Sequence, residues 1–210
     1  MSPLRRQPET REPAKPADAD SARDLKLLRR IAKNDLAALG TLAGLYEPSL
    51  LGLARALLTG RDDLARDAVQ DTWERVIRGA RSFAERSTVR TWLYRILVNR
   101  CHDLRAKAAR ERSPVLARLP RAEDAESAER MELSTRVRAA AAELPDGQRL
   151  VLLLCYHRSL SHTQAAEVLD IPVGTLKSRL AKALASLRVA LDAGTTGTNA
   201  IKDRAGGAER

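Results

Sequence analysis

The stretch SHTQAAEVLDIPVGTLKSRLAKAL, residues 161–184, places polar and basic side chains at a spacing suited to contacting DNA. Between Ile171 and Leu191 there are four basic residues and no acidic one. Lysines can reach guanine acceptors or phosphates, and a serine can bond a base edge or a phosphate. Helical spacing predicts one buried stripe formed by Leu176, Leu180, Ala183 and Leu187. The candidate DNA-reading residues are Thr175, Lys177, Ser178, Arg179, Ala181 and Lys182.

A second block, TWLYRILVNRCHDLRAKAARER at residues 91–112, combines aromatic and basic side chains. Phe83, Trp92 and Tyr94 cluster here, although aromatic residues make up only 3% of the chain. Rings beside arginines suit unstacked bases, each of which gains about 1–3 kcal/mol from stacking. Trp92 can equally fill the core of a helical domain. The preceding segment, 82–88, is polar and irregular and suits a pocket for an extruded base.

A third feature is an acidic stripe in RDDLARDAVQDTWERV, residues 61–76. Its spacing of i, i+4, i+8 and i+11 places the carboxylates on one side of a predicted helix. An acidic stripe repels DNA, so it faces either solvent or a basic protein surface. The stripe consists of Asp63, Asp67, Asp71 and Glu74, and the predicted core-facing residues are Leu64, Ala68, Thr72 and Val76.

The elements that must position these residues are predicted to be all helical, because Ala, Leu and Arg dominate and no run of alternating β-branched residues occurs. Within 161–184, Ser161 and Gln164 match a capping box at the start of a first helix. Pro172 disfavours helical geometry in the residue before it, so the first helix ends near Asp170 and the second begins near Val173. The pattern predicts a helix-turn-helix.

The chain is predicted to hold two small helical domains joined by a flexible linker. The ends, 1–22 and 193–210, are rich in proline or glycine and read as disordered tails. The segment 107–131 carries two prolines and an acidic cluster and reads as the linker. The predicted domains therefore span 23–106 and 132–192.

Composition favours a polyanionic partner. The chain has 37 Lys plus Arg against 27 Asp plus Glu, a net charge of +10. Cys101 and Cys155 lie far apart and the three histidines form no ligand or triad pattern, so we expect no disulfide, metal, cofactor or catalytic residue. No signal peptide is apparent, and the longest apolar run, 150–156, is shorter than the about 20 residues that span a bilayer. We expect a cytoplasmic protein without membrane insertion.

Four motifs together resemble the extracytoplasmic-function (group four) sigma factors of bacterial RNA polymerase. The motifs are DAVQDTWERVIRGARSF, TWLYRILVN, ELPDGQRLVLLL and LSHTQAAEVLDIPVGTLKSRLAKALASLR. The resemblance covers about residues 24–192, with the motifs in the order that the family has. It implies a transcription initiation factor that binds core RNA polymerase and directs it to promoters.

In this resemblance the first domain matches sigma region two, which docks on a coiled coil of the largest polymerase subunit and opens the −10 element. Residues 82–88 match the loop that holds the flipped −10 base in this family, and Asn99 matches a polar residue at that pocket. Arg95 and Arg100 would guide the non-template strand. The residues implied in −10 reading and melting are Ser82, Phe83, Arg86, Ser87, Thr88, Arg95, Asn99 and Arg100. Those implied in polymerase docking are Asp63, Asp67, Gln70, Asp71 and Glu74.

The second domain matches sigma region four, which binds the −35 element and the polymerase flap. The family relation also implies an anti-sigma factor as a partner, although no residue identifies one. Some positions depart from the family pattern. Ala181 is small where relatives carry a bulkier contact, and Cys155 stands where a basic phosphate contact is common, replaced here by His157 or Arg158. Arg90 stands where relatives are aromatic or small.

Two other readings compete with a sigma factor. A stand-alone helix-turn-helix regulator explains residues 161–187 but leaves TWLYRILVN and the acidic stripe without a role. An enzyme such as a site-specific recombinase would need a nucleophile domain, which the first block does not resemble. Adding core polymerase distinguishes these hypotheses, because only a sigma factor restores specific run-off transcription.

Overall fold

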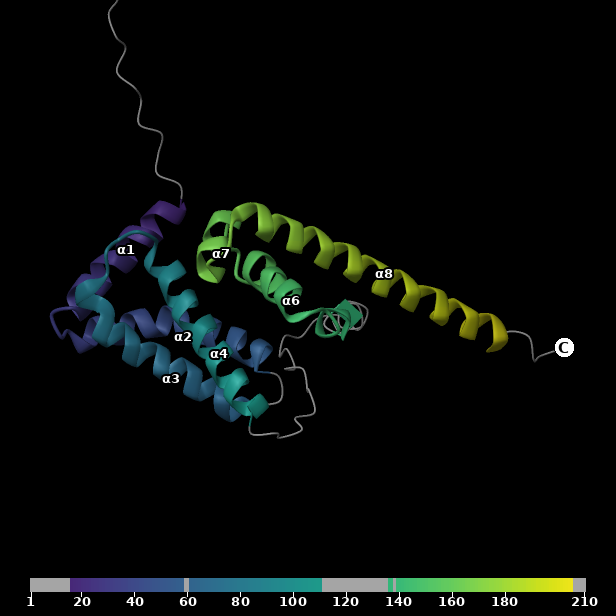
Figure 1. The fold of residues 1–210 in the computed structure, drawn as a ribbon, viewed down its shortest axis with the longest axis horizontal. Coiled ribbons are helices and arrows are strands. Elements are labelled where there is room, and N and C mark those ends of the chain that lie inside the picture. The colour runs from purple at the N-terminus through teal and green to yellow at the C-terminus, as the bar shows by residue number, and fades with distance from the viewer. Residues whose placement is uncertain (1–15, 59–60, 111–135, 138, 206–210) are drawn as a thin grey trace, which may run out of the picture.

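The computed structural model describes residues 16–58, 61–110, 136–137 and 139–205, and within these residues the only regular elements are helices. This confirms the predicted all-α class. The first group of helices precedes the undescribed segment 111–135 (Figure 1). It consists of α1 (Pro16–Ile31), α2 (Leu36–Leu57), α3 (Asp62–Gly79), a short 3₁₀ turn η1 (Ala80–Ser82) and α4 (Val89–Arg110).

The second group follows that segment and contains the predicted helix-turn-helix. Helical residues at 136–137 and 139–142 precede it. The group consists of α6 (Asp146–Leu152), a π-helical turn η2 (Leu153–His157), α7 (His162–Leu169) and α8 (Val173–Ala205). In Figure 1, α8 extends well beyond the rest of this group.

Helix α2 is the centre of the first group. Its side chains at Leu42, Leu50 and Leu53 are fully buried, and it packs against α1, α3 and α4. Asp35 begins the helix by accepting the backbone N–H of Ala38 at 3.1 Å, which satisfies one of the unpaired donors of the first turn. By length and composition α2 is also the one described helix apolar enough to cross a membrane. Four of its leucines are buried in the core, whereas Leu36 and Leu45 are exposed.

The turn between α7 and α8 forms as the sequence predicts. Ser161 Oγ accepts the Gln164 N–H at 3.1 Å, and Gln164 Oε1 accepts the Ser161 N–H at 3.0 Å, so the capping box is complete. Asp170 ends α7 in the left-handed region at φ 53°, which Asp and Asn tolerate better than most residues. Helix α8 then begins at Val173, immediately after Pro172.

Both predicted tails are shorter than expected. Helix α1 begins at Pro16, inside the predicted tail 1–22, because proline is favoured in the first turn, where its missing N–H costs nothing. Helix α8 continues to Ala205, inside the predicted tail 193–210, and the two glycines between residues 193 and 205 weaken but do not interrupt it. Helix α4 runs to Arg110, so the linker begins later than residue 107, and its remainder lies outside the described residues.

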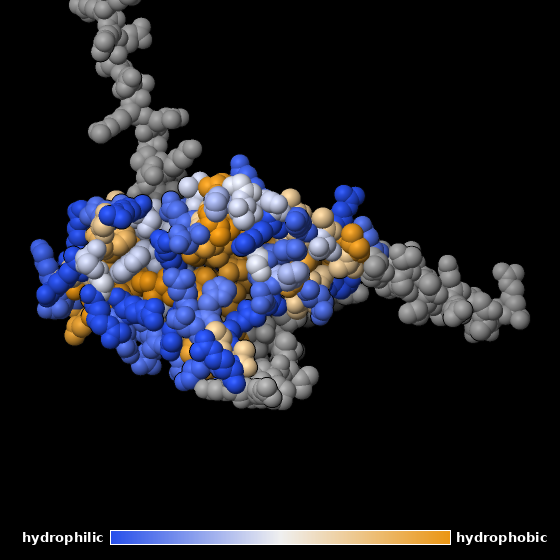
Figure 2. All heavy atoms as spheres, viewed as in Figure 1, coloured by the Kyte–Doolittle hydropathy of each residue, from blue (hydrophilic) through white to orange (hydrophobic). Residues whose placement is uncertain are grey.

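The two groups of helices pack on each other through α4 and α7. Two ion pairs join them: Arg95 Nη2 lies 2.8 Å from Asp170 Oδ1, and Arg105 Nη2 pairs with Asp146 Oδ2. Figure 2 shows mainly hydrophilic residues over the visible face, with apolar residues most evident in its middle, where the groups meet. The contact is therefore largely polar at its edges.

Candidate nucleic-acid interface

Helix α8 has one buried side and one basic exposed side. Leu176, Leu180 and Ala183 are at most 6% exposed, and Leu187 packs against the same core. This confirms the predicted buried stripe. On the other side Lys177, Ser178, Arg179, Ala181 and Lys182 are exposed, and Thr175 is half-buried. The six candidate −35 residues thus lie on one short stretch of helix with five of them accessible to DNA.

One of these residues also lies close to its own domain. Arg179 Nη1 is 3.8 Å from the position that a Cβ would take on Gly147, at the start of α6. Its guanidinium therefore lies beside α6, whereas no hydrogen bond or ion pair within the described residues holds the side chains of Lys177 and Lys182. The two lysines are the more accessible phosphate or base contacts.

The loop between η1 and α4 is held at several points. Ser82 Oγ donates to the Gly79 carbonyl at 3.1 Å, and Glu85 pairs with Arg29 of α1 at 2.7 Å. Thr88 Oγ1 accepts the Thr91 N–H at 3.1 Å, so Thr88 caps α4. These contacts give the loop a defined shape and assign the Thr88 hydroxyl a structural role.

Trp92 packs against this loop. Its ring centroid lies 5.0 Å from that of Phe83 with the planes tilted by 47°, and its Cζ2 would be 3.1 Å from a Cβ on Gly79. Both rings are partly buried against the core. Trp92 therefore fills space between α3, α4 and the loop, as the core alternative predicted, and glycine at 79 allows the close approach.

The loop borders a hollow of about 380 Å³. Arg86 is exposed and Ser87 half-buried on the same loop. The hollow is lined by Ser21, Leu25, Phe83, Glu85, Ser87, Thr88, Val89, Gln164 and Glu167, the last two from α7. Three of the predicted −10 residues, Phe83, Ser87 and Thr88, thus meet at one concave site of a size that accommodates a base.

Asn99 is not among the residues that line this hollow. It is exposed on α4, eleven residues after Thr88, or about 16 Å along the helix axis at 1.5 Å per residue. The sequence interpretation placed Asn99 at the loop pocket. The structure separates the two along the same helix.

Arg95 and Arg100 point to different neighbours. Arg95 pairs with Asp170 in the helix-turn-helix, whereas Arg100 pairs with Asp71 of α3. The two side chains therefore have different partners within the protein, and Asp71 is partly neutralised by Arg100. A shared role of Arg95 and Arg100 on one DNA strand stays a prediction.

The acidic stripe of α3 faces outward, and its predicted core residues Ala68, Thr72 and Val76 are fully buried. Asp63 pairs with Arg61 at 3.2 Å, and Glu74 pairs with Arg78 at 3.3 Å. Hydrogen bonds from Arg61 and from the backbone lower the pKa of Asp63. Asp67 and Gln70 are exposed, and Asp67 has no ion pair within the described ranges. They are the stripe residues most accessible to a partner.

Arg158 does not act as a substitute phosphate contact beside Cys155. It lies at the boundary between the domains, where its Nη1 is 3.4 Å from Ser49 Oγ and its backbone carbonyl accepts a hydrogen bond from Arg90. Burial lowers the pKa of Arg158, Tyr94 opposes this, and the charge of Arg90 adds to it. The phosphate-contact interpretation is therefore wrong for Arg158, while the side chain of His157 lies outside the described ones.

In the sequence, Gly52 is the residue that could have indicated this contact. A Cβ at Gly52 would lie 2.6 Å from Arg158 Nη2, so the guanidinium occupies the space that a side chain on α2 would fill. Glycine inside a helix costs roughly 0.5–1 kcal/mol relative to alanine and often marks such a close approach. The sequence interpretation did not use it.

The described residues contain no group of three or more His, Cys, Asp or Glu side chains placed to hold a metal ion. Cys101 is buried, which raises the pKa of its thiol to about 12 despite the nearby arginines, and Cys155 is half-buried. The described surface instead presents basic, polar and acidic side chains.

Comparisons with known proteins agree with this geometry. Residues 42–111 match the Sigma-70 region 2 family and residues 134–187 match the Sigma-70 region 4 family. The chain is 33% identical over 177 residues to the ECF RNA polymerase sigma factor SigM of Mycobacterium tuberculosis, covering 84% of this chain and 88% of SigM. It is 30% identical over 178 residues to the ECF RNA polymerase sigma factor SigW of Bacillus subtilis, covering 78% and 94%.

Solved structures show the same likeness. CnrH in complex with the cytosolic domain of CnrY matches with a TM-score of 0.63 and 29% identity, over 81% of this chain and 98% of that chain. The sigma factor RpoE in complex with the anti-sigma factor NepR from Bartonella quintana matches with a TM-score of 0.62 and 25% identity, over 73% and 96%.

These comparisons do not favour a stand-alone helix-turn-helix regulator, because they include both domains in one chain. Sigma factors are transcription initiation factors, and the polymerase that they bind performs the chemistry. The chain belongs to the ECF sigma factors, which bind RNA polymerase and direct it to promoters.

Proposed function

We propose that the two groups of helices divide promoter recognition between them. The helices α1–α4 form the region-two domain, extended back to Pro16, and residues 132–192 form the region-four domain. The observation that carries the proposal is the basic face of α8. It lies opposite a fully buried stripe and is presented by a complete capping box and a tight turn, which is the geometry of a helix that enters the major groove.

For the −35 element, Lys177 and Lys182 contact base edges or phosphates and Ser178 supplies a small hydrogen-bonding group. Ala181 lies between them and allows a close approach to the groove. Arg179, beside α6, and Thr175, half-buried at the start of the face, take supporting positions at the edge of the contact.

For the −10 element, the hollow bordered by Phe83, Ser87 and Thr88 holds an extruded base, and Arg86 lies at its edge. Asn99, about 16 Å further along α4, contacts another part of the same element. Arg95 shares this side of α4, one turn before Asn99, and joins the DNA contact when its ion pair with Asp170 opens. Ser82 and Thr88 act by shaping the loop, through their hydrogen bonds to Gly79 and Thr91.

Polymerase docking uses the acidic stripe. Asp67 and Gln70 are its most accessible members, while Asp63, Asp71 and Glu74 each have an arginine partner within the protein. Exposed ion pairs contribute little and exchange readily, so a basic partner surface can displace these arginines. The polymerase surfaces concerned are the largest-subunit coiled coil for this domain and the flap for the region-four domain.

An anti-sigma factor is the further partner that we propose, because a solved relative is held by one, NepR. The place of action is the cytoplasm, where RNA polymerase works, and the chain contributes binding rather than catalysis. No cofactor enters the proposal.

The test uses permanganate, which modifies unpaired thymines, on promoter complexes of the reconstituted holoenzyme. The variants are Phe83→Ala with Ser87→Ala, and separately Asn99→Ala. Thr88 is left intact because its loss would damage the cap of α4. We expect weaker −10 reactivity for both variants, with closed-complex binding to duplex DNA unchanged as the internal control. An unaltered permanganate pattern would contradict the assignment of the loop and of Asn99.

A further inference from the structure

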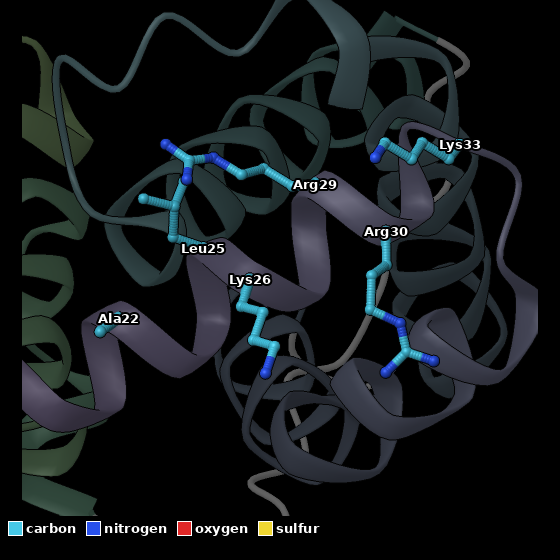
Figure 3. A pocket seen from close by; sticks show the side chains of 6 residues that line it. All are labelled: Ala22, Leu25, Lys26, Arg29, Arg30 and Lys33. Carbon is cyan, nitrogen blue, oxygen red and sulfur yellow. The ribbon is translucent and has the colours of Figure 1, made fainter.

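Helix α1 carries a basic face that none of the roles above uses. Lys26, Arg29, Arg30 and Lys33 follow i, i+3, i+4 and i+7 spacing and, with Ala22 and Leu25, line a hollow of about 340 Å³. Figure 3 shows Lys26, Arg29 and Arg30 leaving α1, with Lys26 and Arg30 directed to the same side, and Lys33 in the turn that follows the helix. A run of cations around a concave surface is the electrostatic footprint of an anionic ligand.

The α1 basic face has more cationic side chains than there are carboxylates beside it to pair with them. Arg29 pairs with Glu85 at 2.7 Å, and Arg30 pairs with Asp35 at 2.7 Å. Lys26 and Lys33 have no ion-pair partner within 4 Å in the part of the chain that the structure describes.

Arg81 adds a fifth cation at the end of the helix, where its Nε donates to the Ala32 carbonyl at 2.9 Å. Five cations thus stand against two carboxylates, and both lysines remain available to a ligand.

The α1 basic face is continuous with the proposed −10 pocket. Leu25 lines both hollows, and the Arg29–Glu85 pair links the basic face to the loop. A strand whose base enters the loop hollow therefore leaves it over α1.

The length of the face also fits a strand. From Lys26 to Lys33, which lies in the turn just after α1, it extends about 10 Å. A stacked strand covers that length in about three nucleotides at 3.4 Å each.

We propose that the α1 basic face binds the phosphates of the single strand that leaves the loop pocket, with Lys26 and Lys33 as the principal contacts and Arg29 released from Glu85 to join them. The inference rests on the proposed role of the loop in holding an extruded base. A single strand is favoured over an acidic protein because the face adjoins the loop hollow directly and because grooves that follow a single-stranded backbone are lined by such cations.

The experiment compares two forked promoter probes bound by holoenzyme. Both probes carry a duplex −35 region and a single-stranded non-template −10 element. The short probe ends with that element. In the extended probe the single strand continues on both sides of the base that the loop holds. The double variant Lys26→Gln with Lys33→Gln should lose most of the affinity that the wild type gains from the extension. Its slope of log affinity against log salt on the extended probe should fall by about 1.4, since each single-strand phosphate contact contributes about 0.7.

A matched loss of two charges elsewhere is the control. Arg55→Gln with Arg66→Gln removes two arginines, one half-buried and one exposed, that both pair with Asp62, and it should keep the full gain from the extension. The charge-preserving variant Lys26→Arg with Lys33→Arg should restore the gain.

Equal losses on both probes, or a loss of core polymerase binding in a separate competition assay, would overturn the inference and assign the face to the polymerase. The proposed loop function fails separately, if Phe83→Ala with Ser87→Ala leaves the preference for the −10 base unchanged on the short probe.

Discussion

At the scale of single residues, the exposed side of α8 carries the most specific prediction. Lysines at 177 and 182 leave the helix on the side opposite the buried Leu176 and Leu180. The sequence was sufficient to predict this division, because helical periodicity depends only on local spacing. It also placed Ser178 and Ala181 on the same exposed side.

Replacing Lys177 or Lys182 with alanine should relax the −35 preference of the holoenzyme. A good base contact contributes about 1–3 kcal/mol of discrimination, so the ratio of affinities for the native and an altered −35 element should fall by about 5- to 150-fold. Competition binding with the two DNAs measures this ratio.

Arg188→Ala is the control, because this residue is 85% exposed and lies further along α8 beside Asp192. It should change affinity for both DNAs alike. An unchanged preference in the two lysine variants would remove α8 from the role of −35 reader.

Other residue roles could not be predicted from the sequence because they depend on partners that are distant in the chain. Arg100 pairs with Asp71 from another helix, and Arg158 packs on Gly52, more than a hundred residues earlier. Both side chains are basic and polar, and composition alone assigns such residues to DNA. Only the fold shows that each is engaged within the protein.

At the scale of elements, the boundaries of α7 and the start of α8 were predicted because their signals are local. Ser161, Gln164 and Pro172 act on their own turn of backbone. The outer ends of α1 and α8 were not predicted, since proline near a helix start and glycine near its end permit either helix or coil. The basic face of α1 lies within the predicted first domain, and the sequence interpretation assigned its residues no role.

The capping box gives a stability prediction for this element. Ser161→Ala removes the acceptor for the Gln164 N–H and should lower the free energy of unfolding by about 0.5–2 kcal/mol. Urea unfolding followed by circular dichroism measures the change. Ser186→Ala, an exposed serine within α8, is the matched control and should have little effect. Equal unfolding free energies for the two variants would show that the cap does not stabilise α7.

At the scale of the whole molecule, the two groups pack through a shared apolar core and through ion pairs at its edge. This contact includes the Arg95–Asp170 and Arg105–Asp146 ion pairs and places Arg90 beside Arg158, two like charges in a half-buried site. Relative motion is the default expectation for two domains of one chain unless their interface is large and hydrophobic. The all-helical class and the two-domain order followed from composition and motif order, whereas this contact between the groups did not.

Weakening the two ion pairs should shift the protein toward separated domains. The variant Asp170→Asn with Asp146→Asn keeps a residue that tolerates positive φ at 170. Exposed ion pairs contribute about 0.2–1 kcal/mol each, so the ratio of separated to packed molecules should rise about 2- to 30-fold.

Small-angle X-ray scattering measures the radius of gyration, which should increase in the variant and, for the wild type, with added salt. A radius that stays the same in both cases would show that other contacts hold the groups together.

The same arrangement should be insensitive to pH near neutrality. Burial alone would raise the pKa of Asp146, but Arg105 and Arg149 outweigh it and hold that pKa below its ordinary value of 3.8. A carboxylate with a lowered pKa contributes its stabilisation at every pH above that ordinary value and loses it only as the pH falls further. The radius of gyration should therefore be the same at about pH 6 and about pH 8.

The most direct test of the account is transcription by core RNA polymerase on a pool of promoter fragments, with the 5′ ends of the products mapped. Core polymerase alone should give no specific starts. Adding the protein should give new starts that share one −35 and one −10 sequence, and Lys177→Ala should alter the −35 sequence while Asn99→Ala weakens opening. A protein that binds duplex DNA by itself and adds no start sites would contradict the central claim.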